Sequence, residues 1–142
     1  MDIAGEISGI EPLLKEGEAF FRVVQRSPLR PGVFNPELVH GLLSMALEKF
    51  AMCILMSAGT MPDNHTFGDL VGELKAHIPV SAEIEAALLE LDVESDLCSL
   101  EIRKTRIPGE ERMRMLIGIG ERLQAAAREC VHEGNLFPLQ LE

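Results

Sequence analysis

The stretch NPELVHGLLSMALEKFAMCILMS, residues 35 to 57, decides the fold class of this chain. Asn35 can cap a helix, Pro36 suits the first helical turn, and Glu37 is favoured by the positive end of the helix dipole. Apolar residues then recur on more than one face of the predicted helix, as far as Ser57. Such a helix is buried on several sides, so we expect it to lie centrally or partly against another subunit.

Helical spacing of apolar residues recurs in every other long segment, whereas no segment shows the sustained alternation of a β-strand. The chain is therefore predicted to be all-α. Because the connecting loops are short, we expect an antiparallel up-and-down bundle of four main helices plus one short helix. The predicted helices cover roughly residues 10–26, 36–57, 67–78, 82–102 and 113–131.

Boundary signals support these limits. Pro28 should end the first helix near Arg26, and Thr66 with Asp69 has the form of a capping box for the short helix. Two glycines, at positions 118 and 120, interrupt the last helix, where each costs about 1 kcal/mol relative to alanine. Their presence predicts the close approach of another helix at this point.

Composition indicates one domain over residues 1–142, with a core over about 9–133 and a C-terminal tail at 134–142. The net charge of −10 argues against general coating of DNA or RNA, because the field of the whole molecule repels a phosphate backbone. Three cysteines without close pair spacing indicate reduced thiols and a cytoplasmic protein. Polar and charged residues interrupt the most apolar stretch, so no membrane span is expected.

The basic residues are unevenly placed. Seven of the thirteen lysines and arginines lie between Arg103 and Arg128, and the densest group is Arg103, Lys104 and Arg106. An acidic chain that gathers cations at one helix junction has either a structural clamp or a binding site for an anion there. Both alternatives remain open at the level of sequence.

Three short motifs follow one another in the chain: ALEKFA at 46–51, GTMPDNHTFGDL at 59–70 and RKTRIPG at 103–109. In their order and spacing they resemble the HEPN domain family, over roughly residues 9 to 132. The resemblance implies a small helical bundle that works beside a small nucleotidyltransferase, either in a toxin–antitoxin couple or as a substrate-binding subunit. It also implies a nucleotide or RNA ligand.

The chain departs from the family's nuclease members at the third motif. Ile107 replaces the tyrosine that many relatives carry, and no histidine follows Arg103 or Arg106 at the nuclease spacing, since the next one is His132. RNA cleavage without a metal needs a group that accepts the proton of the 2′-hydroxyl, which arginine cannot do. The resemblance therefore implies a non-catalytic module with no catalytic residue. The candidate ligand- or anion-binding residues are Arg103, Lys104, Arg106, Glu48, Lys49 and His65.

Glu48 and Lys49 are a possible acid and proton carrier, but adjacent helical residues point about 100° apart and do not form a pair. We favour a structural role in which Glu48 anchors a cation, for instance Arg103 or Arg106. His65 stands just before a helix start, where an imidazole can bond a backbone carbonyl or a carboxylate and hold the loop.

Other functions stay open as alternatives. One is a metal-independent ribonuclease toxin of the HEPN type, with His65 or His77 of a dimer mate as proton acceptor. Another is an assembly-only bundle without a ligand. A phosphotransfer role for His40 and a metal site at Cys130 and His132 are disfavoured, and no metal or cofactor is expected. The wide apolar surface of the second helix predicts a homodimer.

Overall fold

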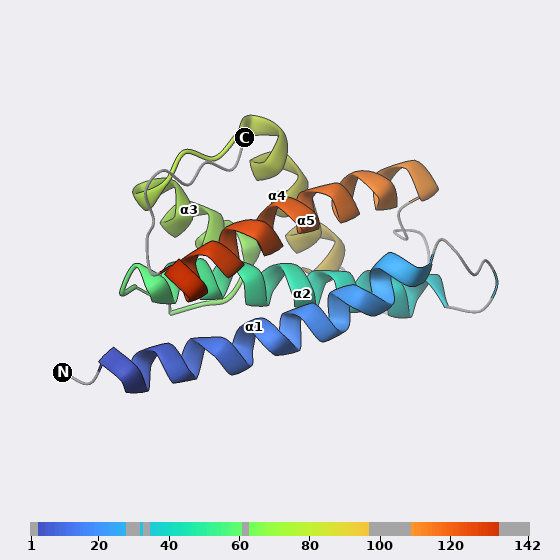
Figure 1. Cartoon of the computed structure of the whole chain (residues 1–142). Coiled ribbons are helices and arrows are strands. Elements are labelled where there is room, and N and C mark those ends of the chain that lie inside the picture. Colours follow the sequence, from blue (N-terminus) through green and yellow to red (C-terminus); the bar gives the residue numbers. More distant parts are fainter. Residues whose placement is uncertain (1–2, 28–31, 33–34, 61–62, 97–108, 134–142) are drawn as a thin grey trace.

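The computed structural model describes residues 3–27, 32, 35–60, 63–96 and 109–133. Within these ranges the regular secondary-structure elements are all α-helices (Figure 1). The prediction of an all-α protein is confirmed. The five helices are α1 (Ile3–Arg26), α2 (Pro36–Ser57), α3 (Phe67–His77), α4 (Ala82–Asp96) and α5 (Glu110–Glu133).

The predicted ends of α1 and α2 and the predicted starts of α2 and α3 agree with the structure, whereas α1 begins at Ile3 and not near residue 10. The Asn35 side chain accepts hydrogen bonds from the backbone N–H groups of Glu37 and Leu38 at the start of α2, at 2.8 and 3.4 Å. At the other end, Gly59 follows in the left-handed region with φ 80°, which glycine adopts without strain. α1 ends at Arg26 and α2 at Ser57, as predicted. The part of the fourth predicted helix beyond Asp96 lies outside the described residues.

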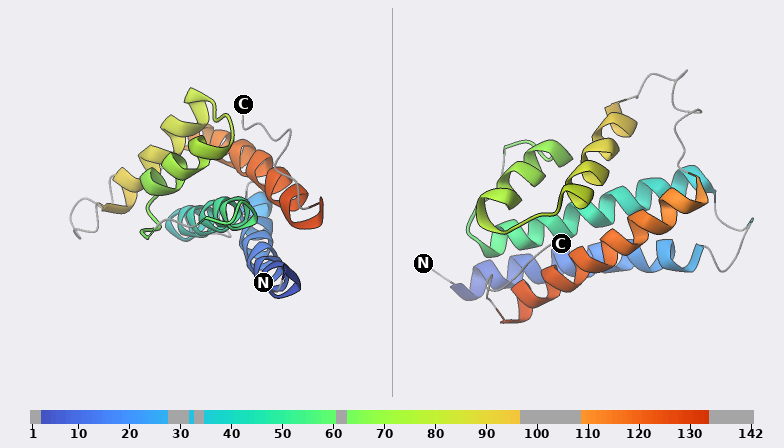
Figure 2. Two further views of the ribbon diagram at one scale, coloured as in Figure 1. Left: turned by 90° about the vertical axis from the view of Figure 1, so that its left-hand side faces the viewer. Right: turned by 90° about the horizontal axis from the view of Figure 1, so that it is seen from above.

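α2 is the central helix of the described structure. Its main contacts are with α1, α3 and α5, while α1 also contacts α5 and α3 packs on α4. Seen end-on, α1 and the α3–α4 pair lie on different sides of α2 (Figure 2). The buried apolar residues, from Ile10 to Val131, form one cluster. The predicted central position of α2 is therefore confirmed.

Two glycines allow α1 to pack closely against α2 and α5. A Cβ at Gly17 of α1 would lie 2.9 Å from the Phe50 ring of α2, and one at Gly120 of α5 would lie 2.5 Å from the Phe21 ring of α1. Both phenylalanines are fully buried and meet edge to face with centroids 5.6 Å apart. The predicted close approach is thus found at Gly120. At Gly118 the prediction is wrong, because a Cβ added there would meet nothing within 4 Å and the space beside it is open.

In the described part of the chain, α2 is the one helix that is long and apolar enough to cross a membrane. Half of its most apolar window is buried inside the protein. The apolar character of α2 is explained by its contacts with three other helices.

Candidate functional site

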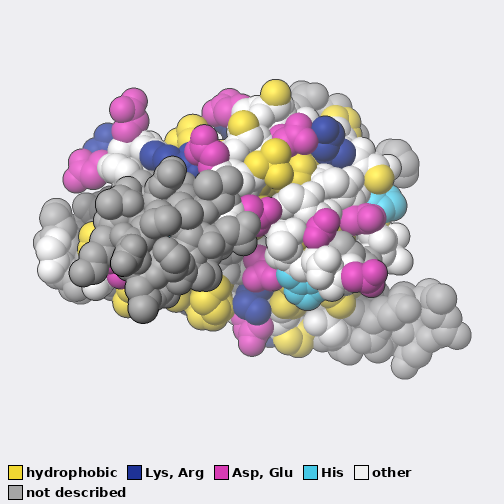
Figure 3. Space-filling view, turned by 180° about the vertical axis from the view of Figure 1, so that it is seen from behind, with side chains coloured by type: hydrophobic (Ala, Val, Ile, Leu, Met, Phe, Trp, Pro, Cys, Tyr) yellow, Lys and Arg dark blue, Asp and Glu magenta, His cyan; other side chains and the backbone are white. Residues whose placement is uncertain are grey.

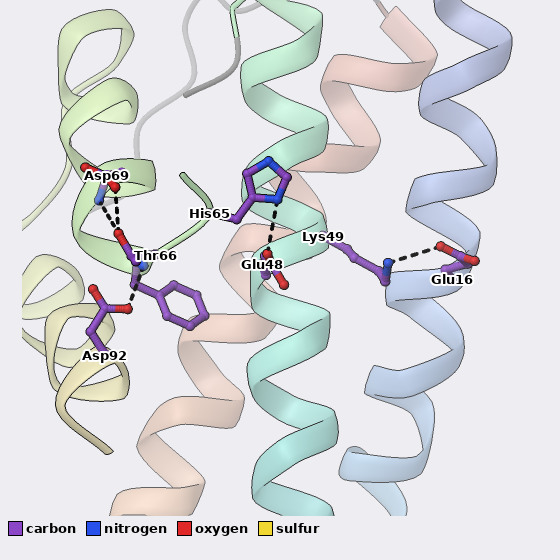
Figure 4. Close-up of polar contacts among 8 residues, drawn as sticks. Glu16, Glu48, Lys49, His65, Thr66, Asp69 and Asp92 are labelled. Atoms are coloured by element: carbon purple, nitrogen blue, oxygen red, sulfur yellow. Dashed lines mark hydrogen bonds and ion pairs between the residues drawn. The ribbon is translucent and has the colours of Figure 1, made fainter. Parts of the chain in front are cut away.

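Glu48 and Lys49 of α2 point in different directions, Lys49 toward α1 and Glu48 toward the loop that carries His65 (Figure 4). Lys49 Nζ lies 3.1 Å from Glu16 Oε2 on α1 and 6.0 Å from the centroid of the Phe20 ring. Glu48 Oε1 lies 3.5 Å from His65 Nδ1, in the loop before α3. The two motif residues therefore contact different neighbours, in keeping with the angle between adjacent helical positions.

The partners of Lys49 and Glu48 indicate a structural role for each side chain. Lys49 is tied to α1, and its side chain is 22% exposed, so it braces the α1–α2 packing. Glu48 lies against an imidazole, which forms an ion pair with it when protonated. An acid–base pair between Glu48 and Lys49 is not formed. Arg103, Lys104 and Arg106, the expected anion site or clamp, lie outside the described residues.

The loop that carries His65 is held by the start of α3. Thr66 caps this helix, accepting a hydrogen bond from the Asp69 backbone N–H at 3.2 Å, as the capping box predicted. Asp92 of α4 adds a second cap: its two carboxylate oxygens accept from the backbone N–H groups of Phe67 and Gly68, at 2.7 and 2.6 Å. A carboxylate here satisfies amides that have no partner within the helix. Position 65 is thereby set close to α2.

The contact between Asp92 and α3 was not predicted from the sequence. The carboxylate of Asp92 comes close because residue 68 is glycine, and a Cβ there would lie 3.3 Å from Asp92 Oδ2. Its partners are 24 and 25 residues away in the chain. A local capping signal cannot reveal a cap supplied from another helix.

Two arginines of α5 pair with carboxylates of other helices. Glu18 of α1, 17% exposed, accepts from Gln124 Nε2 at 2.8 Å and from Arg128 Nε at 2.5 Å, both on α5. Arg112 of α5 pairs with Glu90 of α4 at 2.7 Å. These two arginines hold helices together, whereas the clamp or anion site expected at Arg103, Lys104 and Arg106 stays a prediction.

The thiols agree with the expectation of reduced, buried cysteines. Cys53 and Cys130 are free and buried, whereas Cys98 lies outside the described ranges. Burial, followed by the neighbouring Cys130 thiol and the Glu18 carboxylate, raises the pKa of Cys53 to about 12. Burial and then Glu129 raise the pKa of Cys130 to about 11. Both are poor nucleophiles near neutral pH, because the thiolate is the reactive form.

Within the ranges that the structure describes, no group of three or more His, Cys, Asp and Glu side chains is placed to hold a metal ion. Comparison with protein-family models, with curated proteins and with solved structures found no match. The described site brings together one imidazole beside a carboxylate, and one lysine held by another carboxylate.

Proposed function

We propose that this chain is a non-catalytic, HEPN-like binding module that acts beside a small nucleotidyltransferase, as a homodimer in the cytoplasm. The observation that carries the proposal is the divergence of Glu48 and Lys49, each bound to a different neighbouring element. Residues engaged in this way brace a scaffold. They do not form the acid–base pair that a reaction would need.

The proposal assigns the ligand to the basic group at Arg103, Lys104 and Arg106. A nucleotide or an RNA phosphate is the matching chemistry, because guanidinium groups bind phosphate through paired hydrogen bonds. The acidic remainder of the chain limits binding to this local site and argues against coating of DNA. Buried free thiols support the cytoplasmic location.

We also propose the arrangement of the helices: an antiparallel up-and-down bundle of four main helices, α1, α2, α4 and α5, plus the short helix α3. Opposite directions of α1 and α2 in Figure 1 support it. So does the short connection of residues 78–81 between α3 and α4, whose helices pack on each other.

Co-purification tests the proposal. The full chain is expressed together with the product of the neighbouring reading frame, and nucleotide binding is measured by calorimetry with ATP. We expect a stable complex or ATP binding that is lost in the Arg103→Ala, Arg106→Ala double variant. Lys75→Ala is the matched control, since Lys75 pairs with Glu85 at 2.9 Å on the surface. If neither the enzyme nor ATP binds, the proposal is wrong.

A second function is favoured by one specific contact. The Glu48 carboxylate faces Nδ1 of His65, whose side chain is 44% exposed, and a carboxylate on one imidazole nitrogen orients the other as a proton acceptor. With Arg103 and Arg106 holding the phosphate, this arrangement would suit a metal-independent ribonuclease.

Incubation of the pure chain with single-stranded and structured RNA separates the two functions. The binding module leaves both RNAs intact. Cleavage that disappears in His65→Ala and in the Arg103→Ala, Arg106→Ala variant, but persists in His77→Ala, establishes the nuclease in its place.

A further inference from the structure

The helices α1, α2 and α5 form a three-helix unit in which each helix contacts the other two. All three are long, with 22 to 24 residues. Phe21 of α1 fills the space beside Gly120 of α5 and meets Phe50 of α2 edge to face, so buried rings join the three helices. Glu18 of α1 adds a charged acceptor for two side chains of α5. The three-helix unit therefore has apolar and polar contacts of its own.

The helices α3 and α4 form a hairpin on one side of α2 (Figure 2). α3 contacts α2, whereas the main contacts of α4 are with α3. Near the start of α3 the carboxylate of Asp92 accepts two backbone hydrogen bonds, and near its end Lys75 pairs with Glu85 of α4. The two helices have only 11 and 15 residues, and isolated helices of this length are marginal in water. Each helix of the hairpin therefore depends on the other.

The described polar contacts between the hairpin and the three-helix unit include pairs of partly exposed side chains. Glu48 of α2 and His65, 32% and 44% exposed, form one contact. Glu90 of α4, 61% exposed, forms another with Arg112 of α5. Seen from behind, a histidine, a cation and several carboxylates lie side by side at the surface (Figure 3). Exposed pairs of this kind contribute little free energy, so the apolar side of α3 supplies most of the attachment.

We infer that α3 and α4 open together by local unfolding, as one cooperative unit, while α1, α2 and α5 stay folded. Proteins open in such units where strong contacts lie within a motif and weaker ones join it to the rest. His65 stands just before α3 and Glu48 lies on α2, so opening of the hairpin separates these two side chains. The Glu48–His65 contact is then made only in the closed state, and the hairpin switches it on and off.

Neither a nucleotidyltransferase nor ATP is needed for this opening, so a failed binding test of the proposed function leaves it intact. Native-state hydrogen exchange of the full chain, over a series of low urea concentrations, is the first measurement. We expect the slowest amides of α3 and α4 to share one opening. This opening should be at least about tenfold more populated than the one that exposes the slowest amides of α2 and α5. One opening common to all four helices, or separate openings of α3 and α4, overturns the inference.

A substitution inside the three-helix unit gives the sharper test. Gly120→Ala crowds Phe21 whether the hairpin is closed or open, so it should leave the exchange of α3 and α4 at the wild-type rate. The slowest amides of α2 and α5 should exchange about fivefold faster or more. Glu18→Gln is a milder substitution in the same unit and should give the same pattern if Gly120→Ala does not fold. Equal acceleration in all four helices overturns the inference.

Asp92→Asn is the complementary variant, because it weakens a contact within the hairpin that opening breaks. The slowest amides of α3 and α4 should then exchange faster by the same factor, although the lost cap belongs to α3 alone. Acceleration confined to α3 would show that the two helices do not open together.

The link between opening and the Glu48–His65 contact is tested at pH 6, where an imidazole is ordinarily part-protonated. Glu48→Gln should speed the exchange of both α3 and α4 about twofold or more, because the lost contact exists only in the closed state. Glu16→Gln is the matched control: Glu16 pairs with Lys49 inside the three-helix unit at 3.1 Å, so α3 and α4 should be unaffected. Wild-type exchange of α3 and α4 in Glu48→Gln would show that opening does not control the contact.

Discussion

The ring of Phe21 on α1 occupies the space that a side chain at Gly120 of α5 would need. A Cβ built on Gly120 would lie 2.5 Å from Cε1 and 2.7 Å from Cζ of that ring. The ring cannot move aside easily, because Phe21 is fully buried and meets Phe50 edge to face. The absence of a side chain at one position of α5 therefore sets how closely α1 and α5 pack.

Gly120→Ala should lower the free energy of unfolding by about 1–3 kcal/mol, through overpacking against Phe21. Gly118→Ala is the matched control on the same helix. Open space surrounds position 118, so the substitution should gain up to about 1 kcal/mol from helix propensity. Urea unfolding followed by circular dichroism measures both. Equal effects at the two positions would contradict the packing described for α5.

Asp92→Asn should lower the free energy of unfolding by about 1–3 kcal/mol, because two backbone amides of α3 lose a charged acceptor. Hydrogen exchange should show faster exchange at Phe67 and Gly68. Asp69→Asn, at an exposed position of the same helix, is the comparison and should have the smaller effect. Unchanged exchange at Phe67 and Gly68 would show that Asp92 does not hold the start of α3.

The buried thiols predict a loss of stability at alkaline pH. The folded pKa values of Cys53 and Cys130, about 12 and about 11, are raised above the ordinary value of 9.0. Their protonated forms therefore stabilise the fold fully below pH 9.0, and this contribution is lost as the pH rises from 9.0 through 11 and 12. Each thiol adds a slope of up to about 1.4 kcal/mol per pH unit. Urea unfolding between pH 8 and 10.5 should show a shallower decline in Cys53→Ala than in the wild type, and parallel declines would refute the assignment.

Glu18→Gln should lower the free energy of unfolding by about 1–3 kcal/mol, since Arg128 and Gln124 lose a charged acceptor between α1 and α5. The control is Arg114→Gln, which removes an exposed pair whose atoms are 3.9 Å apart and should leave stability unchanged within error. Thermal unfolding of the two variants side by side is sufficient. A Glu18→Gln protein as stable as the wild type would show that this contact is only superficial.

Helix limits were predicted well because their signals act within one turn. Asn35 and Pro36 stand at the start of α2, and Thr66 caps α3, as their residue types indicate. The divergence of Glu48 and Lys49 also follows from helix geometry alone. Each of these features depends on residues that are neighbours in the chain.

The candidate site was predicted only in part. His65 was expected to meet a carbonyl or carboxylate, and it lies beside Glu48, seventeen residues earlier. Neither Glu16 nor Asp92 was named beforehand, although both hold residues of the predicted motifs. Such contacts follow from which helix faces meet, and one sequence contains no direct record of that pairing.

The amino-acid sequence by itself determined the all-α class, the ends of α1 and α2 and the starts of α2 and α3, and the central place of α2. Caps, prolines and apolar periodicity act locally and add up along the chain. Only the tertiary structure decided that Gly120 is crowded and Gly118 is not, and that Asp92 caps α3. The physical reason is that these properties depend on close packing between residues far apart in sequence, where a few tenths of an ångström separate contact from overlap.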